Sequence, residues 1–134
     1  MKYRYMLDTN IVSSFMRTPA GPVGRRAGVE GPGMACLSIV TAAELRFGAH
    51  KVASARLRKH TEDVFAIFPV IPIEPPADAA YAEIRAHLES TGRLIGPNDL
   101  FIAAHALALD LTLVTANTRE FSRVPGLRVE NWLD

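Results

Sequence analysis

Short apolar runs alternate with longer amphipathic segments along the whole chain. Short apolar runs are typical of strands covered on both faces, whereas apolar residues three or four positions apart are typical of helices. This alternation predicts an α/β fold with a central, mostly parallel sheet of about five strands. The expected strands cover residues 3–7, 34–37, 70–73, 111–115 and 127–129.

Helical patterns fill the intervals between these strands. They cover residues 11–16, 22–29, 38–50, 51–68, 77–91 and 98–109. Pro69 and Gly92 follow two of them, where proline cannot continue a helix and glycine commonly ends one. The segment 98–109 is apolar around nearly its whole circumference after its first turn, which predicts a helix buried in the core.

Length and composition indicate a single globular domain over residues 1–134. A chain of 134 residues can bury one core of ordinary size. Its 49% hydrophobic and 22% charged residues are close to the averages for globular proteins. The net charge of +1 argues against attachment to nucleic acid through overall positive charge, although a local basic patch remains compatible with it.

A cytoplasmic location is expected. Cys36 is the single cysteine, so an intrachain disulfide typical of secreted proteins is excluded. The first ten residues, MKYRYMLDTN, are too short and too polar for a signal peptide. No apolar run approaches the roughly 20 residues that span a membrane.

Three carboxylates occupy comparable places in the expected fold. Asp8 directly follows the first strand, Glu44 lies early in the helix after the second strand, and Asp99 opens the buried helix. Strand carboxyl ends and helix amino ends gather at one edge of a parallel sheet, so these side chains are expected to meet there. Thr115 and Asn117 follow a later strand and would reach the same edge.

Each acid also has a purely structural interpretation. Asp8 suits the N-cap of the next helix. Residues 41–44, Thr-Ala-Ala-Glu, fit a capping box in which Glu44 returns to a main-chain amide. Asp99 suits the positive end of a helix dipole. Three separate caps, however, have no reason to converge on one edge.

Converging carboxylates repel one another unless a cation neutralises them. Mg²⁺ or Mn²⁺ prefers such oxygen ligands, and either can activate water and stabilise charge on a phosphate. The four histidines show no metal-binding spacing, and His105 should face away from Asp99 on their shared helix. The pattern therefore favours phosphodiester cleavage over a zinc site.

Four segments carry a resemblance to a known family. They read YMLDTNIVSSF, SIVTAAELRFGA, GPNDLFIAAHALALDLTLVTANTREF and VPGLRVENW, and together they cover nearly the whole chain. In order and spacing they resemble the PIN-domain family, in particular its VapC-type toxin ribonucleases. The resemblance implies an α/β/α sandwich and an endoribonuclease dependent on Mg²⁺ or Mn²⁺. It also implies a transfer RNA or ribosomal RNA substrate, a VapB-type antitoxin that blocks the acidic site, and a homodimer.

Residue by residue, the resemblance implies a metal site held mainly by Asp8 and Asp99, with Glu44 completing it directly or through water. Many PIN domains carry a further aspartate where this chain has Asn117. Either Glu120 supplies the missing charge or the site holds a single metal.

Neutral side chains complete the implied site. Thr115 and Asn117 would position water or metal as neutral ligands, and Thr9 and Asn10 would brace the loop that carries Asp8.

Two other functions compete with this interpretation. A phosphatase could use Asp8 as a nucleophile, but such enzymes of the haloacid-dehalogenase type carry a second aspartate two residues later, where this chain has Asn10. A PIN-like scaffold that binds RNA or protein without catalysis is the other alternative. Asn117 is compatible with such a scaffold, whereas the presence of all three acids argues against it.

Overall fold

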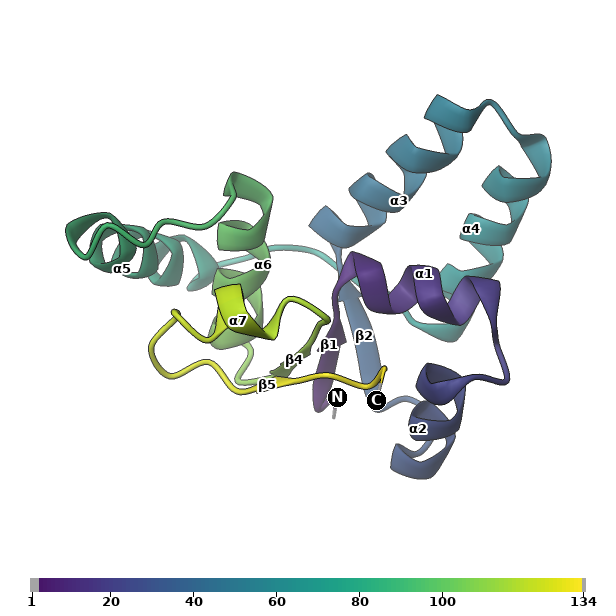
Figure 1. Ribbon diagram of the computed structural model, residues 1–134, viewed down its shortest axis with the longest axis horizontal. Helices are drawn as coiled ribbons and strands as arrows, with labels where there is room; N and C mark the ends of the chain where they lie inside the picture. The colour runs from purple at the N-terminus through teal and green to yellow at the C-terminus, as the bar shows by residue number, and fades with distance from the viewer. Residues whose placement is uncertain (1–2, 134) are drawn as a thin grey trace.

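The computed structural model describes residues 3–133, and in this part of the chain seven helices surround a five-stranded sheet (Figure 1). The elements follow in the order β1 (Tyr5–Leu7), α1 (Thr9–Arg17), α2 (Pro22–Glu30), β2 (Ala35–Ser38), α3 (Ile39–Val52), α4 (Ala55–Ile67), β3 (Val70–Ile71), α5 (Ala77–Ser90), α6 (Pro97–Ala108), β4 (Thr112–Val114), α7 (Thr118–Phe121) and β5 (Val129–Glu130).

The strands pair in the order β3-β2-β1-β4-β5, and every pair is parallel. This arrangement confirms the predicted α/β class and the parallel sheet. The chain first builds outward from β1 through β2 and β3, and then returns to add β4 and β5 on the other side of β1. Ligands of open parallel sheets bind outside the strand carboxyl ends at such a reversal of strand order.

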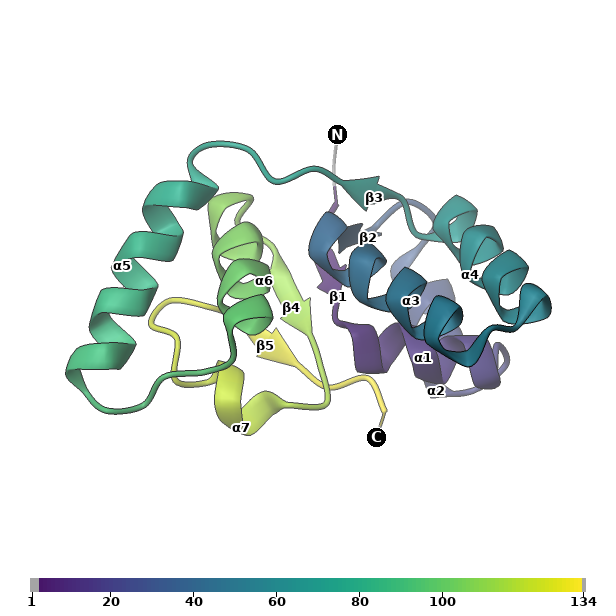
Figure 2. The ribbon, with the colours of Figure 1, turned by 90° about the horizontal axis from the view of Figure 1, so that it is seen from above.

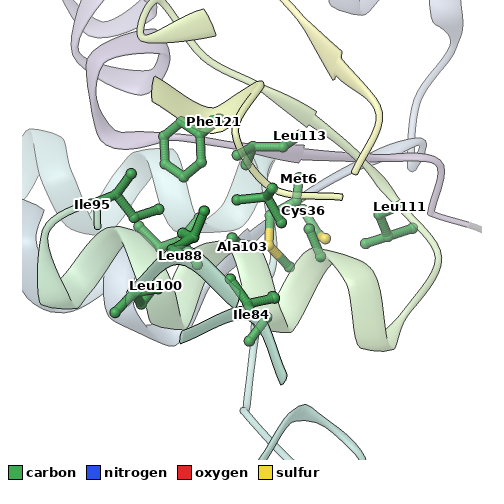
Figure 3. Close-up of a cluster of buried hydrophobic side chains, with 14 residues drawn as sticks. Met6, Cys36, Ile84, Leu88, Ile95, Leu100, Ala103, Leu111, Leu113 and Phe121 are labelled. Atoms are coloured by element: carbon green, nitrogen blue, oxygen red, sulfur yellow. The ribbon is translucent and has the colours of Figure 1, made fainter. Parts of the chain in front are cut away.

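Successive side chains of the central strands enter two different cores. Met6, Cys36 and Leu113 belong to the core under α5 and α6, which Figure 3 shows in close-up. Tyr5 and Leu7 belong to the other core, with α1, α2 and α4. Because both faces of the sheet are covered, β1, β2 and β4 are buried at every position, and Ser38 and Thr112 are their only polar residues. The sequence pattern indicated this predominance of apolar residues. Cys36 is fully buried and is therefore a core residue.

Figure 2 shows α5 and α6 on one side of the molecule and α1 to α4 on the other. The antiparallel pair α3 and α4 projects beyond the sheet in Figure 1. The acidic edge of the sheet lies between these two groups of helices. Within residues 3–133, no helix is long and apolar enough to cross a membrane.

The expected helix over residues 51–68 is wrong at its beginning. Residues 51 and 52 complete α3, and α4 begins only at Ala55. Ala53 takes the left-handed conformation, with φ of 57°, and Ser54 caps α4 by accepting a hydrogen bond from the Leu57 amide at 3.1 Å. A left-handed residue ends a helix, and serine is a favoured N-cap. Ala53 and Ser54 therefore form a turn between α3 and α4, where the sequence pattern predicted a continuous helix.

The last third of the chain contains a helix that the sequence pattern did not predict. Residues 118–121 form α7, one turn long, directly after β4. A single turn is too short to show a helical repeat of apolar residues. Its importance lies in its position, because it carries Glu120 next to the acidic edge.

Candidate active site

Asp8 lies where β1 ends and α1 begins. Its Oδ1 accepts a hydrogen bond from the Thr9 amide at 2.8 Å, so Asp8 is the N-cap of α1. Its Oδ2 accepts bonds from the Thr115 hydroxyl at 2.8 Å and the Asn10 amide group at 3.2 Å. Burial raises the pKa of Asp8, and the charge of Glu44 raises it further against these hydrogen bonds. Capping therefore engages only Oδ1 of Asp8. Its Oδ2 is oriented by the side chains of Thr115, which follows β4, and Asn10.

Two side chains join the loop after β1 to the loop after β4. The Asn10 side-chain oxygen accepts a hydrogen bond from the Ala116 amide at 2.9 Å. The Thr115 hydroxyl accepts one from the Asn117 amide at 2.9 Å while it donates to Asp8. These bonds hold together two loops that are more than 100 residues apart in the chain. The side chain of Asn117 is exposed, and it makes no capping bond to α7.

Glu44 is tied to two other helices. Its Oε1 accepts a hydrogen bond from the Thr9 hydroxyl, and its Oε2 accepts one from the Asn98 amide group at 3.2 Å. Ser38 caps α3 instead, through a bond from the Val40 amide to its hydroxyl at 3.1 Å. The capping-box interpretation of Thr41 and Glu44 is therefore wrong. Glu44 faces the amino ends of α1 and α6 at the sheet edge.

Asp99 lies in the first turn of α6, after Gly96 at the N-cap. Its pKa is raised to about 6, and burial is the largest cause. The negative charges of Asp8, Glu44 and Glu120 add to this rise, in that order. The carboxyl group of Asp99 thus lies within electrostatic reach of all three other acids, so residues from position 8 to position 120 form one acidic cluster.

The chemistry of this donor set fits a hard divalent cation. Its four members, Asp8, Glu44, Asp99 and Glu120, are all carboxylates, the ligands that Mg²⁺ and Mn²⁺ favour. Among residues 3–133, no three histidine, cysteine or acidic side chains already lie close enough to hold an ion together. Like-charge repulsion opposes their closer approach, and a cation would remove that repulsion.

Asn98 belongs to this site, although the sequence analysis did not identify it. It is exposed at the start of α6, and its amide group donates to Glu44. Asparagine is a poor helix former away from an N-cap, and here Gly96 is the cap. An asparagine inside the first turn, directly before Asp99, was the available signal.

A groove adjoins Glu44 between α1, α3 and α4. It has a volume of about 340 Å³ and is lined by Thr9, Ser13, Met16, Arg17, Glu44, Leu45, Gly48, Ala49, Leu57 and Thr61. Its lining is largely apolar, and Glu44 and Arg17 are its charged members. Glu44 is therefore shared between this groove and the acidic cluster.

The sequence of this chain is similar to characterised proteins over nearly its whole length. The sequence model of the PIN domain family matches residues 5–127. Ribonuclease VapC2 of Haemophilus influenzae is 40% identical over 97% of this chain and 98% of its own length. The tRNA(fMet)-specific endonuclease VapC of Shigella flexneri is 38% identical over 96% of this chain and 98% of its own.

The fold is also similar to a solved structure. The crystal structure of DNA-bound VapBC from Salmonella typhimurium contains a chain that superposes with a TM-score of 0.91 and 34% sequence identity. The superposition covers 97% of this chain and 98% of that one. The similarity therefore includes the strands, the helices and the loops that carry the four acids.

Proposed function

Because this chain belongs to the PIN domain family and, within it, to the VapC ribonucleases, we propose that it is the toxin of a toxin–antitoxin pair and cleaves RNA. The observation that carries the proposal is the acidic cluster at the carboxyl edge of the sheet. Three carboxylates from three other segments, Asp8, Glu44 and Glu120, together raise the pKa of Asp99. Such a concentration of like charge is unfavourable for folding alone and is typical of functional sites.

The cofactor in this proposal is Mg²⁺ or Mn²⁺. Asp8 and Asp99 are the principal ligands, and Glu44 completes the site directly or through water. When bound, the ion supplies an acidified water molecule and positive charge beside the phosphate. The purely carboxylate donor set supports a hard cation over zinc.

The reaction is the addition of water across one P–O bond of the RNA backbone, which leaves a phosphate on one fragment and a hydroxyl on the other. Thr115 and Asn10 orient the carboxylate of Asp8 through the hydrogen bonds to Oδ2. Thr9 and Asn98 hold the two oxygens of Glu44. These neutral donors fix the acids before substrate arrives, which lowers the cost of reorganisation during catalysis.

The substrate is proposed to be a structured RNA, either a transfer RNA or a ribosomal RNA. The name of the Shigella flexneri relative, which specifies initiator transfer RNA, supports the first of these. The net charge of +1 means that affinity depends on local contacts. RNA binding should therefore be modest and should weaken as salt rises.

The partner is proposed to be a VapB-type antitoxin, whose chain occupies the groove beside Glu44 and blocks the acidic cluster. The name VapBC of the Salmonella typhimurium structure supports such a partner. We also place this complex in the cytoplasm, with two toxin copies paired. Exposed apolar side chains on α3 and α6, at Ile39 and Phe101, supply surface for protein contacts.

The proposal is tested with the purified chain, freed of any partner, on total cellular RNA. We expect discrete fragments with Mg²⁺ or Mn²⁺, no cleavage after thorough chelation, and recovery when the metal is restored. Fragment ends mapped by sequencing would identify the target RNA. Expression of the chain alone should arrest growth, and coexpression of the antitoxin should relieve the arrest.

Unchanged cleavage in excess chelator would exclude the metal-dependent mechanism. A folded chain that binds RNA but cleaves neither transfer nor ribosomal RNA would favour the non-catalytic scaffold. Asn117 is the residue that supports this second candidate, because it places a neutral amide where other PIN domains often carry an acid.

A substitution of Glu120 tests whether this residue supplies the negative charge that Asn117 lacks. We expect Glu120→Gln to weaken Mn²⁺ binding about tenfold, because it removes one of the three charges that act on Asp99. Asp78→Asn is the control, since Asp78 is an exposed acid in the first turn of α5, outside the cluster. Calorimetric titration of the RNA-free protein measures both affinities. Equal Mn²⁺ affinity in Glu120→Gln and wild type would remove Glu120 from the site.

A further inference from the structure

A buried polar bridge joins α3 to α6 beneath the acidic cluster. The imidazole of His105, on α6, is 1% exposed, and Ser38, the N-cap of α3, is fully buried. The Nδ1 atom of His105 lies 2.8 Å from the Ser38 hydroxyl oxygen. As the sequence indicated, His105 faces away from the acidic cluster. Burying an imidazole costs free energy unless its nitrogens are hydrogen-bonded. The contact with Ser38 therefore stabilises His105 in the core.

The surroundings determine the direction of the hydrogen bonds in the bridge. The carbonyl of Pro72 acts on the imidazole and opposes the lowering of its pKa, and Nε2 makes no hydrogen bond within residues 3–133. A carbonyl only accepts, which favours the tautomer with hydrogen on Nε2. Nδ1 then accepts from the Ser38 hydroxyl, whose oxygen accepts from the Val40 amide at 3.1 Å. Burial lowers the pKa of His105, which maintains this neutral form.

A second polar contact joins the same two helices at the level of the site. The amide group of Asn98, on α6, donates to Glu44, on α3, at 3.2 Å. Six residues separate Ser38 from Glu44, and seven separate Asn98 from His105. At the rise of an α-helix these intervals are about 9 Å and about 10 Å, so the two helices run antiparallel between matched contacts.

The buried hydrogen bond between His105 and Ser38 therefore holds α6 in place against the beginning of α3. Glu44 and Asp99 are each about one and two-thirds turns from it along their helices, and Glu44 lies beyond the carboxyl end of β2, which Ser38 occupies. The exposed contact between Asn98 and Glu44 can exchange with water, whereas the bridge at Ser38 is sealed from solvent. A shift of one helix along the other would move the two carboxylates apart and would break the bridge first.

We propose that His105, through Ser38, is a positioning residue that sets the separation between the carboxylates of Glu44 and Asp99. This inference rests on the proposed function, because the two acids are there assigned to one divalent cation. Groups that orient ligands from behind typically change metal affinity or activity by 10-fold to 100-fold when they are removed. His105 does not touch the substrate or the ion.

The test measures Mn²⁺ affinity of the RNA-free chain beside its melting temperature and its kcat and KM on RNA. His105→Leu removes both ring nitrogens at similar volume and leaves the Ser38 hydroxyl without the imidazole. We expect Mn²⁺ affinity and kcat to fall about tenfold while KM changes less than about twofold. The control is Ile84→Ala in the α5 core, which should lower the melting temperature but leave Mn²⁺ affinity near that of wild type.

A second pair of variants keeps the test decisive if His105→Leu does not fold. His105→Asn returns an amide group to the position of Nδ1, within reach of Ser38, whereas His105→Gln places its amide at the position of Nε2. The inference predicts that asparagine retains most of the Mn²⁺ affinity and that glutamine does not. Equal affinities in these two variants would overturn it.

The outcomes also separate this inference from the proposed function. Wild-type protein that binds no Mn²⁺ and cleaves no RNA would overturn both. Wild-type protein that binds and cleaves, with a His105→Leu variant of equal Mn²⁺ affinity, would overturn the positioning role alone. A loss of affinity in His105→Leu, beside an Ile84→Ala variant that is equally destabilised but binds normally, would establish it.

Discussion

Asp8→Asn should reduce the rate of RNA cleavage about a thousandfold, with little change in RNA affinity. The amide keeps the size of the side chain and one oxygen that can still accept from the Thr9 amide, so the cap of α1 survives. It removes the negative charge with which Asp8 would bind the proposed cation, and metal stabilisation of the transition state is worth several kcal/mol. Single-turnover cleavage at saturating protein, with RNA binding measured separately, gives the two quantities.

Asp110→Asn is the matched control for this substitution. Asp110 is also an aspartate at the end of an element, but its side chain is 88% exposed and pairs with Arg128 on the surface. Its positive φ of 57° suits asparagine as well as aspartate. Both variants should melt cooperatively near the wild-type temperature. Wild-type cleavage by a folded Asp8→Asn protein would contradict the assignment of the site.

Asp99→Asn should have opposite effects on activity and on stability. Cleavage should fall at least a hundredfold if Asp99 is a principal metal ligand, as proposed above. In metal-free buffer above pH 6, however, the variant should melt at a higher temperature than wild type. The reason is that the pKa of Asp99 is raised to about 6 in the folded chain, from an ordinary value of 3.8, so its ionised form destabilises the folded state.

The pH dependence follows from the direction of this pKa shift. Below the ordinary value Asp99 is protonated in both the folded and the unfolded chain, and it adds no penalty. As pH rises toward about 6, the folded chain retains a proton that the unfolded chain releases, so the free energy of unfolding falls. Above about pH 6 the penalty is complete. Melting curves of wild type and Asp99→Asn should therefore separate above pH 6 and converge near pH 4.

Added Mg²⁺ supplies the control for this second prediction. It should raise the melting temperature of wild type at pH 7.5, because ligand binding stabilises the folded state, and should raise that of Asp99→Asn much less. An Asp99→Asn protein that melts below wild type in metal-free buffer at pH 7.5 would contradict the electrostatic account of the cluster.

These two predictions share one physical cause. The fold brings four acids to one edge of the sheet, where burial adds to the cost of their repulsion, and neutral donors such as Thr115 and Asn10 offset part of that cost. The repulsion between these acids lowers the stability of the metal-free protein, and a bound cation would reduce that repulsion. Stability is lost at the place where the chemistry requires charge, which is a common trade-off at functional sites.

Much of the fold was predictable because its signals are local. The strands β1, β2 and β4 are apolar except at Ser38 and Thr112, and several of the helices between them repeat apolar residues at helical spacing. The predicted elements were wrong where an element was too short to show a repeat of apolar residues, or where a single residue changed the direction of the chain. The single turn of α7 and the left-handed Ala53 between α3 and α4 are examples, because neither leaves a repeat in the sequence.

The sequence by itself determined which segments become strands and helices, and it placed Asp8 after β1 and Asp99 in the first turn of α6, because apolar periodicity and strand ends are encoded within a few neighbouring residues. Only the tertiary structure decided the partners: Asn98 with Glu44, 54 residues apart, Asn10 with the loop after β4, and His105 with Ser38, 67 residues apart. Such pairs depend on how α3 and α6 lie against the sheet. That packing is the sum of many contacts between distant segments, and no short stretch of sequence contains it.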